Sequence, residues 1–576
     1  MVYMDYDSVA DALSEFGYSL PENDEIMNRI NSLATEFNLE IDDFVDDLLA
    51  SAMNMKKMVV DSAILDHMEA ELSKKLKKNL DAVMTPSSSK PKRTAFGERP
   101  TSQYANVSCM ELDESIQEDF GSTQLLGKYR AFAPVLPSPS NARYQSRTER
   151  GIIVQESQGS LFVKGSAAGA SVAVEVLSPI PSQKYAADKA SNVIDAKFER
   201  MSVFAAACCD QNPEITGWSI PVKNSTELEY VYGEIIHDLT ESSATGDKTL
   251  SLLMDDENGT VIELDFTRLN EVSVFPGQLV AYYGSFEGGE RFVAVKQFQP
   301  SPLKLSPLRR PPNDDNLRIW CACGPFTTVE NCSYEPLCDL LEMVKEEQPH
   351  LLILMGPFVD SKNTFIQRAE FPETYDGVLE QLMRNIAKAL DGCRTELILQ
   401  PAPSRDLCCA PFFPTPPLDI SSDVCKRMGK RLHSVPDPCI VRVNGIEIAL
   451  TSSEIVAHLS KNEWHRSEDQ ENRDRISRLA SHLLSQRSLY PLYPPCLPMS
   501  TEESLKICAL QSAPHIIIAS SVLSASIKNI NGTVVANPGI MARGGMGSFL
   551  RCDFGSGGVQ DAANLVDISR FEVIRI

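Results

Sequence analysis

The segment LLILMGPFVD, residues 351–360, decides the fold of the second half of this 576-residue chain. Five apolar residues without a polar interruption are typical of a strand buried on both faces, as in a parallel sheet. Gly356 and Pro357 end the run, and Asp360 follows three residues after the proline. The segment therefore predicts a central strand whose carboxyl end leads into a loop, where binding and catalytic sites usually lie.

Elements of a parallel sheet surround this strand in the sequence. Residues 317–323 predict a strand, and Leu337, Leu340, Leu341 and Val344 share one helical face before the central strand begins. This β-α-β order implies parallel strands joined by a right-handed crossover. Four further strand candidates are ELILQ (396–400), CIVRVNGIEIALT (439–451), HIIIAS (515–520) and GTVVANPG (532–539). We therefore predict an α/β domain over residues 311–576.

This order of elements resembles the calcineurin-like phosphoesterase fold, in which a similar strand ends in Gly-Asp-x-x-Asp. Such enzymes hold two metal ions with Asp, His and Asn side chains, and the metals activate a water molecule. Four motifs supply these ligands. The resemblance therefore permits a test of each motif position in this sequence.

None of the four motif positions carries a complete set of metal ligands. IWCACGPFTTV (319–329) has no Asp or His, and Pro357 replaces the bridging aspartate while Gly356 and Asp360 persist. Residues 401–406, PAPSRD, lack Asn and His. The degenerate positions are Cys323, Pro357, Asp360, Ser404, Ser521 and Leu523. We expect an inactive phosphoesterase-like domain without metal or other cofactor, in which Gly356 and Asn537-Pro538-Gly539 form structural turns.

A second pattern, five short strands with clear turns between them, lies upstream. The runs are VYGEIIH (231–237), TLSLLMD (249–255), TVIELDF (260–266), QLVAYYGSF (278–286) and RFVAVKQF (291–298). They predict a small barrel of the OB type within residues 146–310, which include flanking segments. Tyr282, Tyr283 and Phe286 are available to stack on bases, but Asp and Glu are frequent here. A protein-binding or structural barrel is favoured over one that binds single strands.

The N-terminal region has a different character. Residues 1–78 show four apolar helical stripes, among them Ile26, Ile30 and Leu33, and predict an all-α bundle. Thirteen of the first fifty residues are Asp or Glu, which indicates either a solvated face or a docking surface for basic helical peptides. Residues 79–145 are rich in Ser and Pro and predict a flexible linker, in which Thr85 and Ser138 precede proline and are candidate phosphorylation sites.

Composition narrows the class of protein. The formal net charge of −24 argues against broad electrostatic capture of nucleic acid, although a local basic face can coexist with that average. Fifteen cysteines without any Cys-x-x-Cys pair indicate reduced thiols inside the cell rather than disulfides or structural zinc. No apolar run approaches the roughly 20 residues needed to cross a bilayer, so no membrane association is expected.

The combination of helical module, linker, OB barrel and metal-less phosphoesterase domain resembles the B subunits of eukaryotic replicative DNA polymerases, and most closely the alpha type. Residues 324–363 carry the resemblance most strongly, followed by PAPSRD (401–406), LYPLYPP (489–495) and VVANPG (534–539). It implies a nuclear, non-catalytic scaffold that binds the zinc-bearing C-terminal domain of the polymerase alpha catalytic subunit. Primase would join through the complex, other replication factors would bind the N-terminal module, and DNA contact would be weak or indirect.

Several alternatives stay open at this point. The delta and epsilon types share the barrel and the inactive domain, although the long linker favours alpha. A phosphodiesterase with rearranged ligands and an autonomous single-strand binder are the other two hypotheses. Tyr490 and Tyr493, within a proline cluster, are candidate partner-interface residues or parts of a structural loop.

Overall fold

The computed structural model describes most of the chain beyond residue 142. The described ranges are 143–163, 172–182, 184, 187–222, 225–237, 250–256, 259–286, 291–308, 316–368, 373–467, 474–543, 547–555 and 565–576, with isolated residues between 21 and 68. The chain divides into two compact units, Met1–Ser115 and Ile116–Ile576. Thr85, Ser138 and residues 79–142 of the predicted linker lie outside the described residues.

Several described residues of the first unit belong to the predicted helical stripes. Ile26, Ile30 and Leu33 are helical and buried, as are Leu48 and Met68. Apolar side chains at three- and four-residue steps face inward because these steps return to the same side of a helix. For these positions, the predicted helical periodicity is confirmed.

Five strands of the second unit close into a barrel. They are β3 (Glu229–His237), β4 (Leu250–Met254), β5 (Val261–Asp265), β7 (Leu279–Phe286) and β8 (Arg291–Phe298), in the order β3-β4-β5-β8-β7. All neighbours are antiparallel except β5 and β8. The five predicted strands are thus confirmed. Tyr282 and Phe286, expected to be available for stacking, are instead buried in the barrel core, because they alternate inward along β7.

The larger of two further sheets contains the central strand. Its order is β1 (Ile153–Gln158), β20 (Ser569–Arg575), β19 (Ser548–Phe554), β9 (Leu317–Cys323), β10 (Leu351–Met355), β11 (Glu396–Gln400) and β12 (Leu432–Ser434). Strands β9 to β12 are parallel to one another. The strand predicted from LLILM is β10, and all five of its residues are buried.

The second sheet faces the first. Its order is β17 (Ser526–Ile530), β18 (Thr533–Asn537), β16 (Ile516–Ala519), β14 (Ile446–Thr451), β13 (Cys439–Val443) and β2 (Val174–Val176). The predicted strand over 439–451 is in fact a hairpin, β13 and β14, with Asn444-Gly445 at the turn in positive φ. Asn-Gly between two apolar runs is a strong hairpin signal, which explains the turn at this point.

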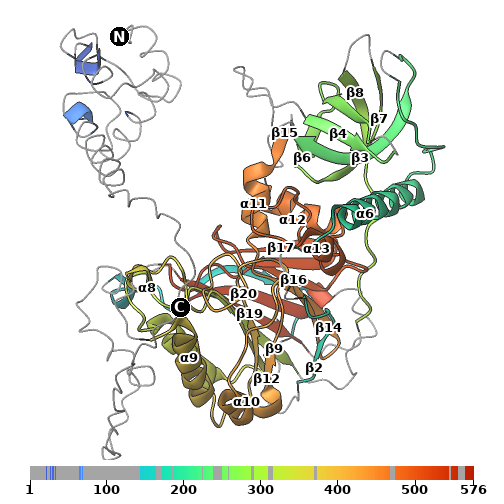
Figure 1. Ribbon diagram of the computed structural model, residues 1–576. Coiled ribbons are helices and arrows are strands. Elements are labelled where there is room, and N and C mark those ends of the chain that lie inside the picture. Colours follow the sequence, from blue (N-terminus) through green and yellow to red (C-terminus); the bar gives the residue numbers. More distant parts are fainter. Residues whose placement is uncertain are drawn as a thin grey trace, which may run out of the picture. The chain divides into compact units, whose positions relative to one another are not determined.

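Helices cover the outer faces of both sheets, giving four layers (Figure 1). On the larger sheet lie α7 (Glu335–Glu347) and α9 (Tyr375–Ala389), followed by the shorter α8 (Thr364–Gln367), α10 (Ser422–Met428) and η2 (Gly429–Arg431). The second sheet is covered by α11 (Ile455–Asn462) and α12 (Arg475–Ser485), with α13 (Thr501–Ile507) further along. The short η3 (Leu565–Ile568) instead contacts β1 and β20 of the larger sheet. Among the described helices, none combines the length and apolar character that a bilayer crossing requires.

The two sheets share an apolar inner layer. Ile353 of β10, Ile448 of β14 and Ile516 of β16 belong to it, and all three are at most 1% exposed. The neighbours Leu352 and Leu354 point the other way, into the layer beneath α7 and α9. Burial on both faces explains why the strand sequence is continuously apolar.

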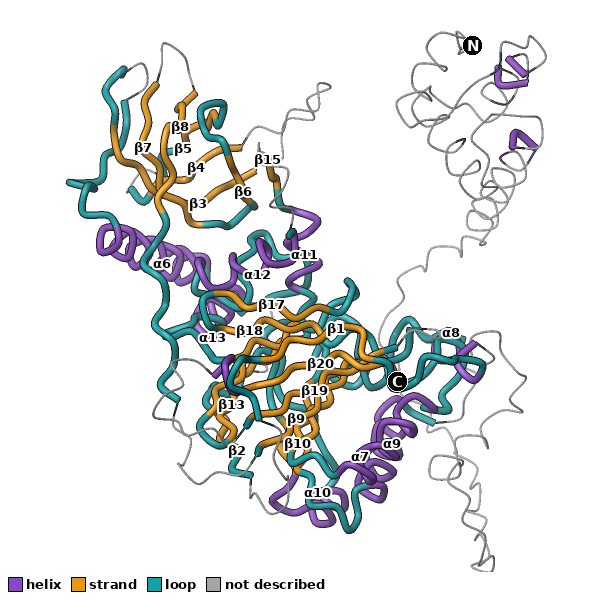
Figure 2. The backbone as a smooth tube through the Cα atoms, turned by 180° about the vertical axis from the view of Figure 1, so that it is seen from behind, coloured by secondary structure: helices purple, strands orange, loops and turns teal. Residues whose placement is uncertain are grey.

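Two strands come from the segment ahead of the barrel. β1 pairs with β20 at the edge of the larger sheet, and β2 pairs with β13 at the edge of the second (Figure 2). The sequence analysis grouped this segment with the barrel as flanking residues and predicted no strand in it. The chain therefore contributes to both sheets before it forms the barrel and returns.

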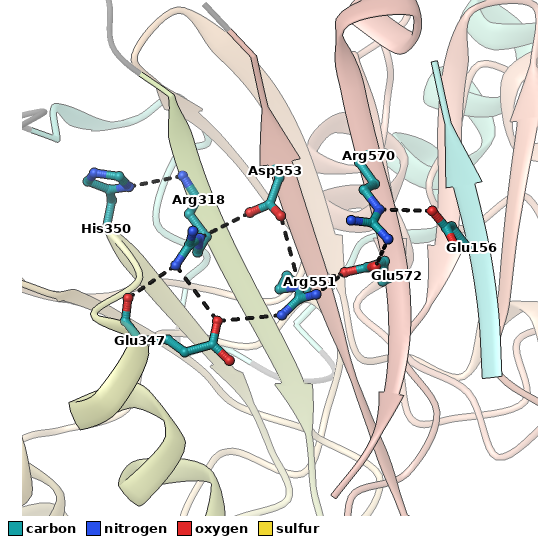
Figure 3. Close-up of polar contacts among 8 residues, drawn as sticks. All are labelled: Glu156, Arg318, Glu347, His350, Arg551, Asp553, Arg570 and Glu572. Atoms are coloured by element: carbon teal, nitrogen blue, oxygen red, sulfur yellow. Dashed lines mark hydrogen bonds and ion pairs between the residues drawn. The ribbon is translucent and has the colours of Figure 1, made fainter. Parts of the chain in front are cut away.

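A charged ladder crosses the outer face of the larger sheet (Figure 3). Arg570 bridges Glu156 of β1, at 2.9 Å, and Glu572, at 2.6 Å. Arg551 of β19 donates to Glu572 at 2.6 Å, and Arg318 of β9 contacts Asp553 at 3.2 Å. Glu572 is completely buried. Because a buried carboxylate requires paired cations, the ladder fixes the register of four strands.

The barrel is fastened to the four-layer domain by α6 (Ala190–Gln211) and one glutamine. Lys197 of α6 contacts Glu234 of β3 at 2.7 Å. Gln486, at the end of α12, accepts from the Leu279 amide at 2.7 Å and donates to its carbonyl at 2.9 Å. The side chain thereby pairs with β7 as a strand would. A second contact is the pairing of β6 (Glu271–Val274) with β15 (Trp464–Ser467).

Candidate functional site: the loops at the strand ends

Loops from both sheets meet at the carboxyl ends of the parallel strands. Gly324 and Gly356, which follow β9 and β10, continue the sheet by donating to Met355 and Gln400, each at 2.8 Å. Ser452, which follows β14 in the other sheet, donates to the Pro401 carbonyl at 2.6 Å. The loops that would carry metal ligands are therefore together, as the sequence analysis expected of strand ends.

The first two loops are pressed against each other. A Cβ atom at Gly324 would lie 2.2 Å from the Pro357 carbonyl oxygen, and one at Gly356 would lie 3.0 Å from the Ala402 amide. Glycine is required at Gly324, because the Pro357 backbone approaches too closely for a side chain. At Gly356 a Cβ atom would also press on the Asp406 carboxylate, at 2.9 Å. Pro357, where a bridging aspartate would stand, lies within this packed backbone.

Asp360, predicted at the end of the second motif, is paired with an arginine. Arg405 donates from Nε to Oδ1 at 3.1 Å and from Nη2 to Oδ2 at 2.5 Å. The Asp360 side chain is 4% exposed and the Arg405 side chain is 15% exposed. The Lys362 amide also donates to Oδ1. A guanidinium thus neutralises this carboxylate in the bidentate geometry that arginine favours.

Asp406, next in the chain, is a structural carboxylate. It accepts from the amides of Phe358 at 2.7 Å, Val359 at 3.2 Å and Cys408 at 3.3 Å. Burial raises its pKa to about 6, although the three amide donors act in the opposite direction. Asp406 therefore ties the β10 loop to the β11 loop and faces the backbone.

Asp437 lies deeper, and its side chain is completely buried. Burial raises its pKa to about 7. Its Oδ2 lies 2.7 Å from the Ser452 hydroxyl, which also lies 2.6 Å from the Pro401 carbonyl. The Ser452 hydroxyl donates to Oδ2, and the Ser452 amide donates to Oδ1 at 3.1 Å. These donors favour the charged carboxylate and act against the effect of burial.

Asn537 organises the loop at the last motif. Its Oδ1 accepts from the amides of Ser521 and Gly539, each at 3.1 Å, and its Nδ2 donates to the Leu523 carbonyl at 3.2 Å. Gly539 has a φ of 77°, which favours glycine. The predicted turn residues Asn537, Pro538 and Gly539 lie together here, and Leu523 packs against the core below.

The remaining degenerate positions offer no ligand set either. The buried Cys323 thiol lies 3.7 Å from the Met355 sulfur, and Ser404 lies one residue before Arg405. Within the described ranges, no three His, Cys, Asp or Glu side chains are arranged to hold a metal ion. Asp360, Asp406 and Asp437 bond to an arginine, to backbone amides and to a serine, and these contacts hold the loops together.

The two tyrosines predicted at a partner interface have internal contacts. Tyr490 is 5% exposed, and its hydroxyl accepts from the Cys496 amide at 3.1 Å. Tyr493 donates its amide to Pro276 of the barrel at 3.0 Å, and the Lys197 ammonium lies 3.6 Å from its ring centre. Their role toward a partner stays a prediction. Tyr493 supports the junction of barrel and α/β domain, and Tyr490 packs within the α/β domain against Phe413 and His458.

Two of the polar residues in these loops were not predicted from the sequence. Arg405 and Asp437 were not singled out, although Arg405 lies in the PAPSRD segment. Asp360 and Arg405 are 45 residues apart, and no local pattern links them. Only the two adjoining parallel strands bring the pair together.

Two family models match the chain. The model for the B subunit of DNA polymerases alpha and epsilon matches residues 319–528, which include loops at the strand ends. The model for the N-terminal region of the DNA polymerase alpha B subunit matches residues 7–75. The first match defines the class of protein: an accessory, B-type subunit of a replicative DNA polymerase. The second match is specific to the alpha type.

Relatives extend the match over the whole length. The chain is 35% identical to the B subunit of DNA polymerase alpha from Caenorhabditis elegans, with 99% of each chain covered. It is 27% identical to that of Rattus norvegicus, with 94% of each covered, and 27% identical to that of Schizosaccharomyces pombe, with 63% and 65% covered. The chain belongs to the family of DNA polymerase alpha B subunits.

Proposed function

We propose that this chain is the non-catalytic, scaffolding subunit of the DNA polymerase alpha–primase complex. The observation that carries the proposal is the full-length similarity to the Caenorhabditis elegans protein. The loops at the strand ends support it, because the carboxylates that persist there bond to an arginine, to backbone amides or to serine. The domain thus keeps a rigid shape without catalytic geometry.

The architecture supports the two proposed domain types. The barrel order is β3-β4-β5-β8-β7, and its one parallel pair is β5 with β8. This arrangement matches an OB-type Greek-key barrel. Two facing sheets with helices outside, and polar loops at the parallel strand ends, match a phosphoesterase-like domain. We retain the division into 1–78, 79–145, 146–310 and 311–576, with β1 and β2 completing the last domain.

The partner follows from the family. We propose that the barrel and the α/β domain together bind the zinc-bearing C-terminal domain of the catalytic subunit, with primase joining through the complex. The acidic N-terminal module would bind other replication factors, and Thr85 and Ser138 would carry regulatory phosphates. Action in the nucleus follows from this role. The rigid junction of barrel and α/β domain supports a surface that uses both.

Co-expression with the C-terminal domain of a polymerase alpha catalytic subunit, followed by size-exclusion chromatography, tests the proposal. We expect one peak containing both chains in equal amounts. The matched control is the corresponding domain of a delta-type catalytic subunit, which should elute separately. Separate elution of the alpha-type domain would refute the proposal, as would manganese-dependent hydrolysis of a generic phosphodiester that Asp360→Ala abolishes.

A further inference from the structure

A group of basic side chains lies where α9 and α10 end together. Arg384 of α9 contacts Asp423 of α10 at 3.7 Å, and Arg427 of α10 donates to Asp391, just after α9, at 3.0 Å. Both contacts advance along the two helices in the same direction, so the helices end side by side (Figure 1). The turn before β11 and η2 complete this end of the domain.

Two of the bases there have structural roles. Arg427 is paired with Asp391, and the Arg427 guanidinium holds the pKa of the Asp391 carboxyl below its usual range. Arg431 donates from Nη1 to the carbonyls of Cys393, at 2.8 Å, and of Leu390 and Thr395, each at 3.4 Å. Arg431 thereby satisfies carbonyl groups beyond the end of α9. The contacts of Arg427 and Arg431 within the domain therefore account for both side chains without a ligand.

Four further cations at this end have no such role. Lys388, Arg394, Lys426 and Lys430 are exposed, and none forms a salt bridge with another described residue. Lys388 also lies close enough to act on Asp391 electrostatically. We call these four residues the α9–α10 basic face. The chain as a whole has a formal net charge of −24. Four cations at one end of a domain repel one another, and a chain with this net charge does not need them for solubility.

The surroundings of the basic face indicate what it binds. The exposed large apolar residues of the described chain include none between 376 and 435 except Leu407, which belongs to the loops at the strand ends. Protein partners are held mainly by apolar and aromatic anchors, and single strands by aromatic stacking. Point charges alone suit the phosphates of a duplex.

We propose that the α9–α10 basic face contacts the phosphate backbone of duplex nucleic acid, without reading its sequence. This goes beyond the scaffolding function and does not depend on it. Neutralising about four phosphates gives a slope of about −3.6 for log K against log salt concentration. The affinity should then fall about 150-fold between 50 and 200 mM salt.

The test uses the full-length chain and a fluorescent 20-base-pair duplex in anisotropy titrations. The variant is Lys388→Gln, Lys426→Gln and Lys430→Gln together, which removes three charges and keeps helix-forming side chains. The matched control is Lys304→Gln, Lys362→Gln and Lys461→Gln, three other exposed lysines without a salt bridge among the described residues. Both variants keep the linker bases Lys90, Lys92 and Arg93.

We expect the slope to drop to about −1 in the first variant and to stay unchanged in the control. Equal losses in the two variants would overturn the proposal, since binding would then be diffuse. Tighter binding of a 20-residue polyglutamate than of the duplex would also overturn it, in favour of an acidic protein partner. Co-elution with the catalytic subunit is independent of each of these results.

Discussion

Replacing Arg405 should reveal the free-energy cost of burying the Asp360 carboxylate without a paired cation. Asp360 is 4% exposed and receives two hydrogen bonds from Arg405. Arg405→Ala leaves this charge buried with the Lys362 amide as a donor but no cation. Breaking a buried pair from one side costs about 3–5 kcal/mol. For a domain of this size, that lowers Tm by roughly 6–20 °C.

The assay is thermal unfolding followed by tryptophan fluorescence, because Trp320 lies in β9 beneath the outer helices. Adding Asp360→Asn to Arg405→Ala removes the buried charge and should restore more than half of the loss. Arg384→Ala is the matched control: it breaks an exposed pair with Glu380 in the same domain, worth about 0.3–0.5 kcal/mol. A loss below about 1 kcal/mol for Arg405→Ala, or a double variant no more stable than the single one, would contradict the reasoning.

Two further predictions concern a buried proton and the domain junction. The folded pKa of Asp437, raised to about 7, means that the unfolded chain loses this proton at lower pH, so stability falls as pH rises toward 7 and is constant above it. Relative to Asp437→Asn, the wild type should therefore lose about 3 kcal/mol between pH 5 and 8 in denaturant titrations; a difference independent of pH would show that the carboxyl is not protonated when folded. Gln486→Ala should leave the buried Leu279 amide and carbonyl unpaired, at about 1–3 kcal/mol each. Faster hydrogen exchange of the Leu279 amide would report this, and unchanged exchange would show that the clamp is dispensable.

The apolar strands were predictable because their residue types alone indicate burial on both faces. LLILM is buried on both faces, so every position must be apolar and the pattern is unambiguous. The barrel strands, bounded by turn residues, were equally clear. The match of these elements to the structure rests on local signals.

The strands at the sheet edges were missed because their sequences are mixed. IVQESQ of β1 is partly or fully exposed along its length and carries Glu156 toward Arg570. An edge strand needs only one neighbour, and its charges are balanced by residues far along the chain. The ladder of Figure 3 is of the same kind, since none of its pairs is visible without the register.

For the loops at the strand ends, residue types allowed the prediction that Pro357, Ser521 and Leu523 are not metal ligands, and this stays a prediction. Residue types did not indicate that Arg405 would pair with Asp360 or that Ser452 would donate to Asp437, because both contacts join loops of different strands. Negative inferences need only residue types, whereas positive ones need geometry.

The pairing of β1 with β20 determines which part of the chain can complete its fold first during synthesis. Glu156 and Arg570, which meet across these strands, are 414 residues apart. At roughly 5–20 residues per second, a ribosome makes the second about 20–80 s after the first. Throughout that time the edge of the larger sheet lacks its neighbour, while the barrel strands, made in between, have all of their partners. The barrel strands can therefore pair during synthesis, whereas the edge of the larger sheet stays incomplete until residues 569–575 have left the ribosome.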